Sequence, residues 1–401
     1  MRTTTLFIFF FCLLSYISAA KNQSKIASVP FEVVGSYAVV EISINGSPKL
    51  NFILDSGVSN TIITELHHED SVELKFAGYI PIRGLGLGSG VQAQSSHGNT
   101  FQAGKMTLVN QTVVFLEEDI FNLSKHVGSK INGILGSDFF ENHIVKIDYN
   151  SQRITFYENE SFIAPKKYTP IPMIIEGSKM FVTLPVTEID WSTRNAKMLL
   201  DTGAELTAWF RSYGDHPIEI PAKKIRSYIG QGLSGEIKGY MGRIYMMNMG
   251  GHPLYHPIVH FPDSAAIMEA ILVAEREGTI GSQILSRFNL IFDQSRKRLY
   301  IKPNHHFKRP FSYNIAGIEL ILDDPDIPLP EISQIRENSP AEHAGLQVGD
   351  KIFQINELSG IKTNINVLKS YFEISSRSPL RLTILRGDRT LHFKVEMKGF
   401  L

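Results

Sequence analysis

The chain has 401 residues, 43% of them apolar, and its 40 Lys and Arg residues balance its 40 Asp and Glu residues. This length and apolar content predict two or three domains, each large enough to bury a core of its own. Because the charges balance, no overall field favours nucleic acid or an anionic membrane, and we expect neither as a partner.

The N-terminus has the pattern of an export signal. Arg2 is followed by an apolar run over residues 6–14 and by Ser-Ala-Ala at residues 18–20, which predicts a signal peptide at 1–20. The apolar run is too short for a transmembrane helix, and no second run of membrane length follows. The only cysteine, Cys12, lies within it, so a mature protein without this peptide has no thiol for disulfides, catalysis or metal binding. We expect an exported protein without an integral membrane segment.

Residues up to 303 have mostly the pattern of β-strands. Short apolar or alternating runs such as 37–44 and 181–186 are separated by Asn-Gly, Gly-Gly and Asp turns. Three segments favour short helices instead, at 137–142, 263–274 and 282–287. The predicted fold class for this part is therefore mainly β.

The pattern changes after residue 303. Residues 304–310 contain adjacent histidines and a proline and predict a linker. Beyond it, 338–346 has a Ser cap, Pro in the first turn and a final Gly, the signals of a helix. A second helix is predicted at 364–374. Residues 311–401 are therefore expected to form a smaller α/β module.

A short motif occurs twice in the strand-rich part, each time after an apolar run. The two copies are Asp55-Ser56-Gly57 and Asp201-Thr202-Gly203. The pattern consists of two apolar residues, then Asp, then either Ser or Thr, and finally Gly. It should occur by chance roughly 0.03 times in a chain of this length. Each copy is followed, at nearly the same distance, by an apolar-Gly element at 133–136 or 278–281.

The duplication extends over whole domains. Asp55 and Asp201 are 146 residues apart (201 − 55), and further matches follow at offsets of 142 to 146, including Asp148 with Asp293. The offset changes within polar stretches, where surface hairpins tolerate insertions. We infer two homologous β lobes, at 21–160 and 161–303.

Carboxylates on matching turns of a duplicated unit suit an acid/base dyad, in which one group ionises and its neighbour keeps a proton. Peptide hydrolysis needs an activated water and a protonated leaving amine, and one proton shared by two carboxyls serves both needs. Gly57 and Gly203 permit the tight turns that bring the carboxyls together. Either motif alone would indicate an ordinary turn, but the pair predicts Asp55 and Asp201 as catalytic residues.

A glycine-rich segment is also duplicated. Gly86, Gly88 and Gly90 in the first lobe correspond to the segment with Gly232 and Gly235 in the second. Neither copy has the spacing of a nucleotide-binding loop. The duplication favours hairpins that approach the substrate as flaps, with plain turns as the alternative.

A row of histidines is the one pattern that suggests a metal. His252, His256 and His260 are spaced by four residues, but Pro253 and Pro257 exclude the helix that would align them. On a strand this spacing is about 13 Å, too far for one ion. We expect no metal site and no cofactor.

With these motifs the chain resembles the retropepsin and pepsin clan of aspartic proteases, most closely the duplicated, PDZ-carrying aspartyl proteases of Bacteroidetes-type bacteria. The resemblance rests on FILDSGVSNT (52–61), GILGSDFFENHIVKIDY (133–149), LLDTGA (199–204), GTIGSQILSRFNLIFD (278–293) and SPAEHAGLQVGDKI (339–352). It implies two acid-protease lobes paired within one chain, hydrogen bonds from Ser56 and Thr202 across the dyad, and a periplasmic or secreted location. Val58 departs from the family, which usually has Ala, Ser or Thr there.

The PDZ resemblance implies a site for C-terminal peptides, which add as a strand while backbone amides hold the carboxylate. The residues implied are Ile315, Ala316, Gly317 and Ile318, with helix 364–374 as the other wall. The alternative is a module that only packs on the lobes as a cap.

These motifs leave two functions open. The first is an aspartic endopeptidase that acts on polypeptides, with the PDZ-like module recruiting or positioning them. The second is a catalytically silent protease-like scaffold that acts as a PDZ peptide-binding adaptor. The sequence favours the first, because a silent relic would be expected to lose an Asp or Gly of its duplicated motif.

Overall fold

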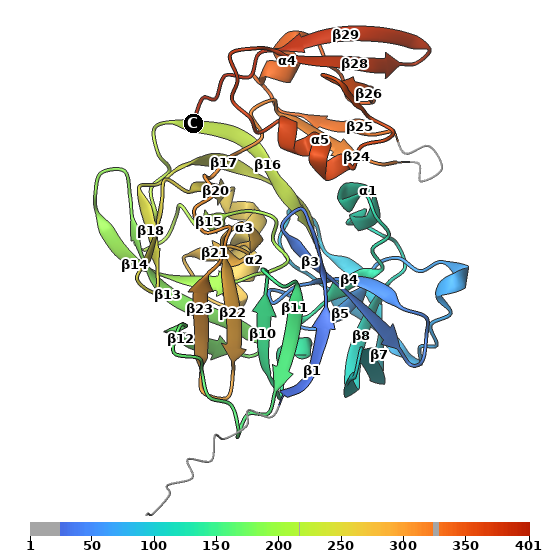
Figure 1. The fold of residues 1–401 in the computed structure, drawn as a ribbon, viewed down its shortest axis with the longest axis vertical. Helices are drawn as coiled ribbons and strands as arrows, with labels where there is room; N and C mark the ends of the chain where they lie inside the picture. The colour runs from blue at the N-terminus through green and yellow to red at the C-terminus, as the bar shows by residue number, and fades with distance from the viewer. Residues whose placement is uncertain (1–24, 216, 324–328) are drawn as a thin grey trace, which may run out of the picture.

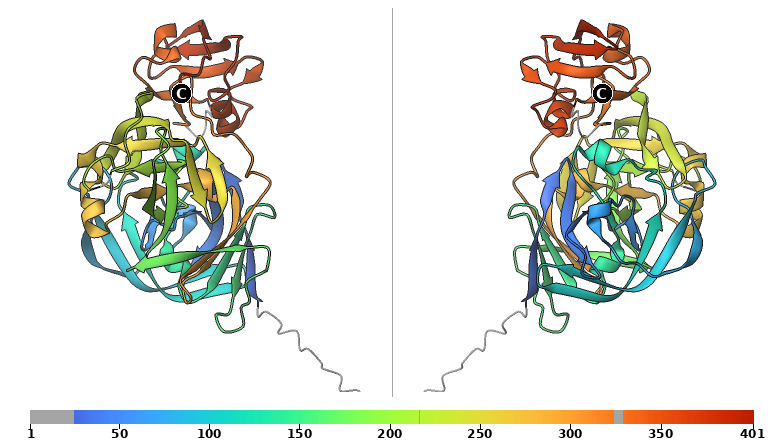
Figure 2. Two further views of the ribbon diagram at one scale, coloured as in Figure 1. Left: turned by 90° about the vertical axis from the view of Figure 1, so that its left-hand side faces the viewer. Right: turned by 90° about the vertical axis from the view of Figure 1, so that its right-hand side faces the viewer.

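The computed structural model describes residues 25–215, 217–323 and 329–401. The predicted signal peptide and Cys12 lie outside the described residues. Two β lobes form one body, and the C-terminal module sits at one end of it (Figures 1 and 2). The prediction of a mainly β fold with two acid-protease-like lobes and a PDZ-like module is confirmed.

Lobe 1 is built on an eight-stranded sheet with the order β2-β3-β4-β9-β5-β8-β7-β6. Its strands are β2 (Glu32–Val34), β3 (Tyr37–Ile44), β4 (Leu50–Leu54), β5 (Thr61–Ile63), β6 (Phe76–Ile82), β7 (Val91–Ala103), β8 (Met106–Leu116) and β9 (Gly133–Leu135). The strand that leads to Asp55, β4, pairs in parallel with the apolar-Gly strand β9. This pairing explains why the two motifs share one lobe at fixed spacing.

Lobe 2 repeats this topology, with β13-β14-β21-β15-β20-β17-β16 in the places of β3-β4-β9-β5-β8-β7-β6. These strands are β13 (Lys179–Thr187), β14 (Thr193–Leu200), β15 (Ala208–Phe210), β16 (Lys224–Gly232), β17 (Gly235–Arg243), β20 (Ile258–Pro262) and β21 (Gly278–Ile280), and a hairpin of β18 (Met246–Met249) and β19 (His252–Tyr255) is added. As in lobe 1, the strand leading to the aspartate pairs in parallel with an apolar-Gly strand.

The lobes are joined by strands from both halves of the chain, in the order β1-β11-β10-β22-β23-β12. These are β1 (Lys25–Pro30), β10 (Ile144–Asp148), β11 (Arg153–Tyr157), β12 (Thr169–Glu176), β22 (Phe288–Asp293) and β23 (Arg298–Pro303). At the centre Lys146 lies opposite Ile291, its own counterpart 145 residues later (291 − 146). Val145 and Ile147 pair with Phe292 and Leu290 on either side. Such self-complementary pairing is that of a two-fold axis, here an approximate one within one chain.

Short helices close the lobes. They are η1 (His68–Asp70), α1 (Leu123–Val127), η2 (Ser137–Phe140), α2 (Ser264–Val273) and α3 (Ser282–Leu285). The helices predicted at 137–142, 263–274 and 282–287 are present, the first and last as single turns. Helix α1 was not predicted, although Gly128 ends it with a φ of +77° in the manner of a helix C-cap.

The C-terminal module folds around a six-stranded sheet and two helices. Its elements are β24 (Ile318–Ile321), β25 (Glu331–Ile335), α4 (Pro340–Ala344), β26 (Lys351–Ile355), β27 (Leu358–Ser359), α5 (Ile365–Tyr371), β28 (Leu380–Arg386) and β29 (Arg389–Val395). Helix α4 has the predicted signals, since the Ser339 hydroxyl accepts from the amide of Glu342 and Gly345 ends the helix. Helix α5 covers the middle of the predicted 364–374.

The segment predicted as a linker is fixed to lobe 2. The guanidinium of Arg287 donates to the backbone carbonyls of residues 306, 307, 309 and 310, and its Cζ lies 3.9 Å from the ring centroid of Phe311. The apolar core of the module also includes Met241 and Ile258 of lobe 2. The module is therefore packed against the lobes rather than tethered beside them.

Candidate active site

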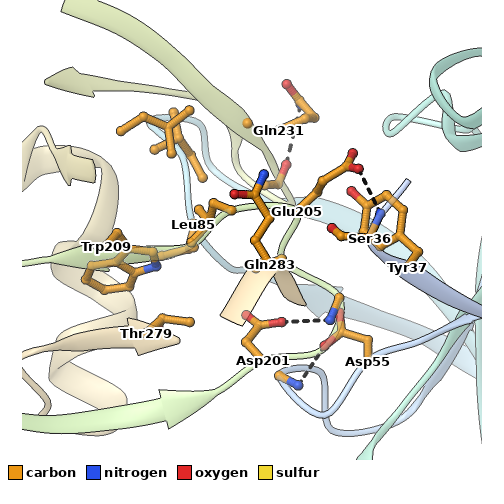
Figure 3. Close-up of a pocket in the computed structure, with 18 of the residues that line it drawn as sticks. Ser36, Tyr37, Asp55, Leu85, Asp201, Glu205, Trp209, Gln231, Thr279 and Gln283 are labelled. Carbon is orange, nitrogen blue, oxygen red and sulfur yellow. Dashed lines mark hydrogen bonds between the residues drawn. The ribbon is translucent and has the colours of Figure 1, made fainter. Parts of the chain in front are cut away.

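The two aspartates meet where the loops after β4 and β14 face each other across the approximate two-fold axis (Figure 3). The amide of Gly57 donates to Asp55 Oδ1 at 2.6 Å, and the amide of Gly203 donates to Asp201 Oδ1 at 3.1 Å. Asp55 is 7% exposed. Each carboxylate is thus held by its own turn and directed at the other lobe.

Ser56 and Thr202 lock the two turns together. The Ser56 hydroxyl donates to the carbonyl of Leu200, and the Thr202 hydroxyl donates to the carbonyl of Leu54, both at 2.8 Å. The Ser56 hydroxyl also accepts the amide of Thr202 at 3.2 Å, and the Thr202 hydroxyl accepts the amide of Ser56 at 3.0 Å. Four reciprocal hydrogen bonds, all buried, therefore hold the two lobes in register at the site.

The motif glycines leave space for the opposite carboxylate. A Cβ on Gly57 would lie 2.5 Å from Asp201 Cγ, and a Cβ on Gly203 would lie 2.2 Å from Asp55 Cγ. No side chain fits at that separation. Gly57 and Gly203 are therefore required by the close approach of the two turns.

Burial and mutual repulsion set the charge of the pair. Burial raises the pKa of Asp55 well above its usual range, and the nearby charge of Asp201 raises it further. Burial also raises the pKa of Asp201, against which the charges of Lys179 and Arg276 act. Full ionisation of the pair is therefore less favourable than that of two isolated carboxyls.

A matching hairpin of each lobe reaches the site. Lys179 of lobe 2 donates through Nζ to the carbonyl of Gly57. Tyr37 is its counterpart in lobe 1, 142 residues earlier (179 − 37), and lines the cleft beside Asp55. Next to Tyr37, the amide of Ser36 donates to Glu205 at 3.3 Å. The repeat thus places a cation on one side of the dyad and a phenol on the other.

Val58 keeps the backbone role of its position. Its carbonyl accepts the amide of Ser137 at 2.8 Å, as that of Ala204 accepts the amide of Ser282 at 2.8 Å. The Val58 side chain packs on the apolar cluster of lobe 1. The valine therefore leaves this backbone hydrogen bond the same as in lobe 2.

The five glycines predicted in flaps lie at the tips of the β6–β7 and β16–β17 hairpins, which meet over the cleft. The amide of Ser234 donates to the carbonyl of Leu85 at 2.9 Å. A Cβ on Gly86 would lie 2.3 Å from the carbonyl carbon of Ser234, and one on Gly232 would lie 2.0 Å from the Leu85 oxygen. Gly232 lines the cleft. Of the rest, Gly88 donates to the Ser234 carbonyl, while Gly90 and Gly235 have positive φ angles of +83° and +111°.

One cleft of about 1310 Å³ runs between the lobes, beneath the flap tips and along the module. Asp55 and Asp201 lie in its wall, together with Trp209, and helix α5 contributes Lys369 and Ser370. A cleft that has the dyad in its wall and continues from beneath the flap tips to the module suits an extended polypeptide.

The predicted carboxylate-binding residues of the module are buried, and their amides are occupied. Ile315 and Ala316 donate to the carbonyl of Phe372 at 2.7 and 3.2 Å, and Gly317 and Ile318 donate to Asn314 Oδ1 at 2.8 and 3.3 Å. In this conformation they do not face an open carboxylate site, so their role in peptide binding stays a prediction.

The end of helix α1 in lobe 1 contacts both walls of the expected groove. The amide of Leu322, just after β24, donates to the carbonyl of Lys125 at 2.9 Å. From α5, Asn366 and Lys369 donate to the carbonyls of Val127 and His126, at 3.0 and 2.8 Å. Lobe 1 thus occupies one end of the groove.

The histidine row does not form a site. His252 and His260 lie on the separate strands β19 and β20, and burial lowers the pKa of His260 to about 4. Within 25–215, 217–323 and 329–401 no group of three His, Cys, Asp or Glu could hold a metal ion. Nor does that part of the chain contain a helix of sufficient length and apolarity for a membrane span.

Three residues at the site were not predicted from the sequence: Lys179, Tyr37 and Arg276. The duplicated Gly-Ser at 35–36 and 177–178 could have identified the first two, since each follows a copy directly. Arg276 has no such signal, because it precedes the apolar-Gly element in one lobe only.

Two segments of the chain match known protein families. Residues 40–139 match the family model described as aspartyl protease, and residues 331–386 match the model described as PDZ domain. Among solved structures, the aspartic proteinase from Irpex lacteus is similar, at 14% identity and a TM-score of 0.41, over 71% of this chain and 98% of that one. No match was found among curated proteins.

Proposed function

Because the chain combines an aspartyl protease domain with a PDZ domain, we propose that it is an aspartic endopeptidase. The observation that carries the proposal is the pair of facing carboxyls, Asp55 and Asp201, locked by the reciprocal hydrogen bonds of Ser56 and Thr202. A silent scaffold has no need of a buried acidic pair, which destabilises the fold at neutral pH.

The proposed reaction uses the single proton of the pair. The ionised carboxylate accepts a proton from a water molecule while the oxygen of that water attacks the peptide carbonyl carbon. The protonated carboxyl donates to the carbonyl oxygen, which gives a neutral gem-diol. When the C–N bond breaks, one carboxyl protonates the leaving nitrogen and the other takes a proton from the diol, so the pair returns to one proton.

The flaps fit this chemistry. Both tips are closed over the cleft and bonded to each other through Ser234 and Leu85. A polypeptide cannot enter an elongated cleft beneath joined tips without their separation. We propose that substrate binding breaks the tip contacts and that closure over the bound chain excludes bulk water from the dyad.

We propose that the PDZ-like module positions polypeptides along the cleft. Its helix α5 supplies part of the cleft wall, which supports a role in substrate contact. Recruitment of free C-termini would require the end of α1 to leave the groove. The alternative of a cap is supported by the same contacts, and binding of C-terminal peptides by the full-length protein separates the two roles.

The test is digestion of an unfolded protein from acid to neutral pH, with and without a statine-type inhibitor. We expect cleavage that is blocked by the inhibitor and is not affected by a metal chelator. Absence of cleavage at every pH, together with tight binding of C-terminal peptides, would instead support the adaptor function. Export is also proposed, from the N-terminal pattern, and is checked by fractionation of cells that express the full chain.

A further inference from the structure

The two lobes form equivalent pockets on either side of the dyad. In lobe 1, Ile62 on β5 lies opposite Ile134 on β9. In lobe 2, Trp209 on β15 lies opposite Thr279 on β21 in the same register. All four residues line the cleft. Trp209 and Thr279 therefore occupy the positions of Ile62 and Ile134, and Figure 3 shows them on the Asp201 side.

The lobe 1 pocket is apolar. Ile62 and Ile134 pack with Val114 of β8 in one cluster, to which Ile80 and Ile82 of the first flap also belong. This wall offers no charge and no hydrogen-bond donor from its side chains. It suits an apolar substrate side chain.

The lobe 2 pocket is cationic. Arg276 is 6% exposed, lines the cleft, and has its Cζ 5.3 Å from the ring centroid of Trp209. Its Nη1 contacts two carbonyls, of Ala270 and Ala274, at 3.2 and 3.3 Å. Its Nε has no hydrogen-bond partner among the described residues, and neither has Oγ1 of Thr279, which is 1% exposed.

Other buried arginines show what Arg276 lacks. Arg211 forms an ion pair with Glu277 at 3.3 Å, and Arg287 donates hydrogen bonds to backbone carbonyls of the linker. No acidic side chain of the described residues lies within ion-pair distance of Arg276. Arg211 also has an Nε without a hydrogen-bond partner, but Glu277 balances its charge, so the difference is the missing ion pair of Arg276. A buried guanidinium without an acidic partner is costly unless a bound group balances its charge.

We propose that Arg276, Thr279 and Trp209 form a subsite for an acidic substrate side chain, so that cleavage sites carry Asp or Glu on one side of the scissile bond. The equivalent lobe 1 pocket then receives an apolar residue on the other side. A carboxylate matches the fork of donors on arginine, and the Thr279 hydroxyl adds a third donor. The inference rests on the proposed peptidase function and specifies its substrate class.

The first experiment compares kcat/KM for peptides with Glu, Gln or Leu at each position flanking the bond. Wild-type protein is expected to prefer Glu over Gln at one of them by roughly 10-fold or more. The preference should fade below about pH 4, where the substrate carboxyl gains a proton. In Arg276→Gln the Glu-to-Gln ratio should fall to near one, with partial recovery in Arg276→Lys. Arg298→Gln, which removes the same charge from the exposed face of β23, should keep the wild-type ratio.

The second experiment measures binding by calorimetry and does not depend on turnover. Statine-containing peptides with Glu or Gln beside the statine are titrated into wild-type protein and Arg276→Gln. If wild-type protein, but not the variant, binds the Glu peptide more tightly than the Gln peptide, the subsite is supported. If in addition no peptide is cleaved, only the peptidase function is rejected. Equal binding of both peptides, or an unchanged ratio in the variant, overturns the assignment.

Discussion

The two lobes share a backbone but differ in the side chains that face the cleft. Both carry the parallel strand pair, the Asp turn and the flap hairpin in the same order. At equivalent positions lobe 1 has Tyr37 and Ile134, whereas lobe 2 has Lys179 and Thr279. The backbone is the same in both lobes because the carboxyls must meet, while the subsites have no such constraint.

A single chain makes this divergence possible. In a symmetric homodimer every substitution appears on both sides of the axis, so the two subsites remain identical. Here the lobes are covalently joined, and each side can be adjusted separately. Substitutions at equivalent positions therefore test where the two lobes are still alike and where they differ.

The largest expected effect is the loss of either aspartate. Asp55→Asn and Asp201→Asn should each lower kcat by roughly 10⁴-fold, and the double variant should be no worse than either, because the carboxyls act as one unit. Initial rates on a peptide substrate measure this. Near wild-type activity of Asp55→Asn alone would show that lobe 1 is not catalytic.

The thermal stability of the same two Asn variants is a control for folding. Because burial raises the pKa of Asp55 and Asp201 above that of the unfolded chain, the folded state binds more protons and wild-type stability falls as pH rises through the folded pKa. The Asn variants lose this penalty, so they should unfold at a higher temperature than wild type at neutral pH. The difference should vanish below the ordinary carboxyl pKa, about 3.9.

Activity should also be independent of protein concentration, since both aspartates lie in one chain. Serial dilution should leave the specific activity constant, whereas a dyad formed between two chains would dissociate. A specific activity that collapses at low concentration would contradict a site within one chain.

The second effect in size concerns the locking hydrogen bonds. Ser56→Ala and Thr202→Ala each remove two buried bonds and leave a carbonyl and an amide unpaired, at a cost of about 2–4 kcal/mol. The two costs should be similar, because the contacts are reciprocal. Chemical denaturation measures both losses of stability. A large difference between the two variants would mean that the reciprocal hydrogen bonds do not contribute equally to stability.

The duplication made several parts of the site predictable, although the equivalent residues Tyr37 and Lys179 were missed, and the PDZ-like module was predicted from its own motif. The dyad, the two turns and the flap hairpins were predictable because each occurs twice in register. Arg276 was not predictable, because it has no counterpart in lobe 1. Its proposed role depends on stacking against Trp209 and on the lack of an acidic partner among the described residues, and both are features of the tertiary structure. The contact of helix α1 with the module escaped prediction for the same reason.

The two lobes also hold the module differently. Lobe 1 donates backbone carbonyls to helix α5, whereas lobe 2 adds Met241 and Ile258 to the module core and a hydrogen bond from Arg243 to the carbonyl of Phe311. Replacing Asn366 and Lys369 together by Ala removes two hydrogen bonds to α1 and should destabilise by about 1–2 kcal/mol. If the groove binds C-terminal peptides, the variant should bind them more tightly, because the competing α1 contact is weakened. Stability loss without any peptide binding would support the cap.

The smallest and most specific effect is on pH dependence. The ammonium of Lys179 lies beside the dyad and lowers the pKa of both aspartates, whereas Tyr37 at the equivalent position stays neutral because burial raises its pKa. The active dyad carries one proton, so its window ends at low pH where a second proton binds and at high pH where the last one leaves. Lys179→Met removes a positive charge, raises both limits, and should move the profile of kcat/KM to higher pH. Tyr37→Phe removes no charge and should leave both limits in place. A shift in Tyr37→Phe equal to that in Lys179→Met would show that packing rather than charge sets the window, and that the lobes are electrostatically equivalent at this position.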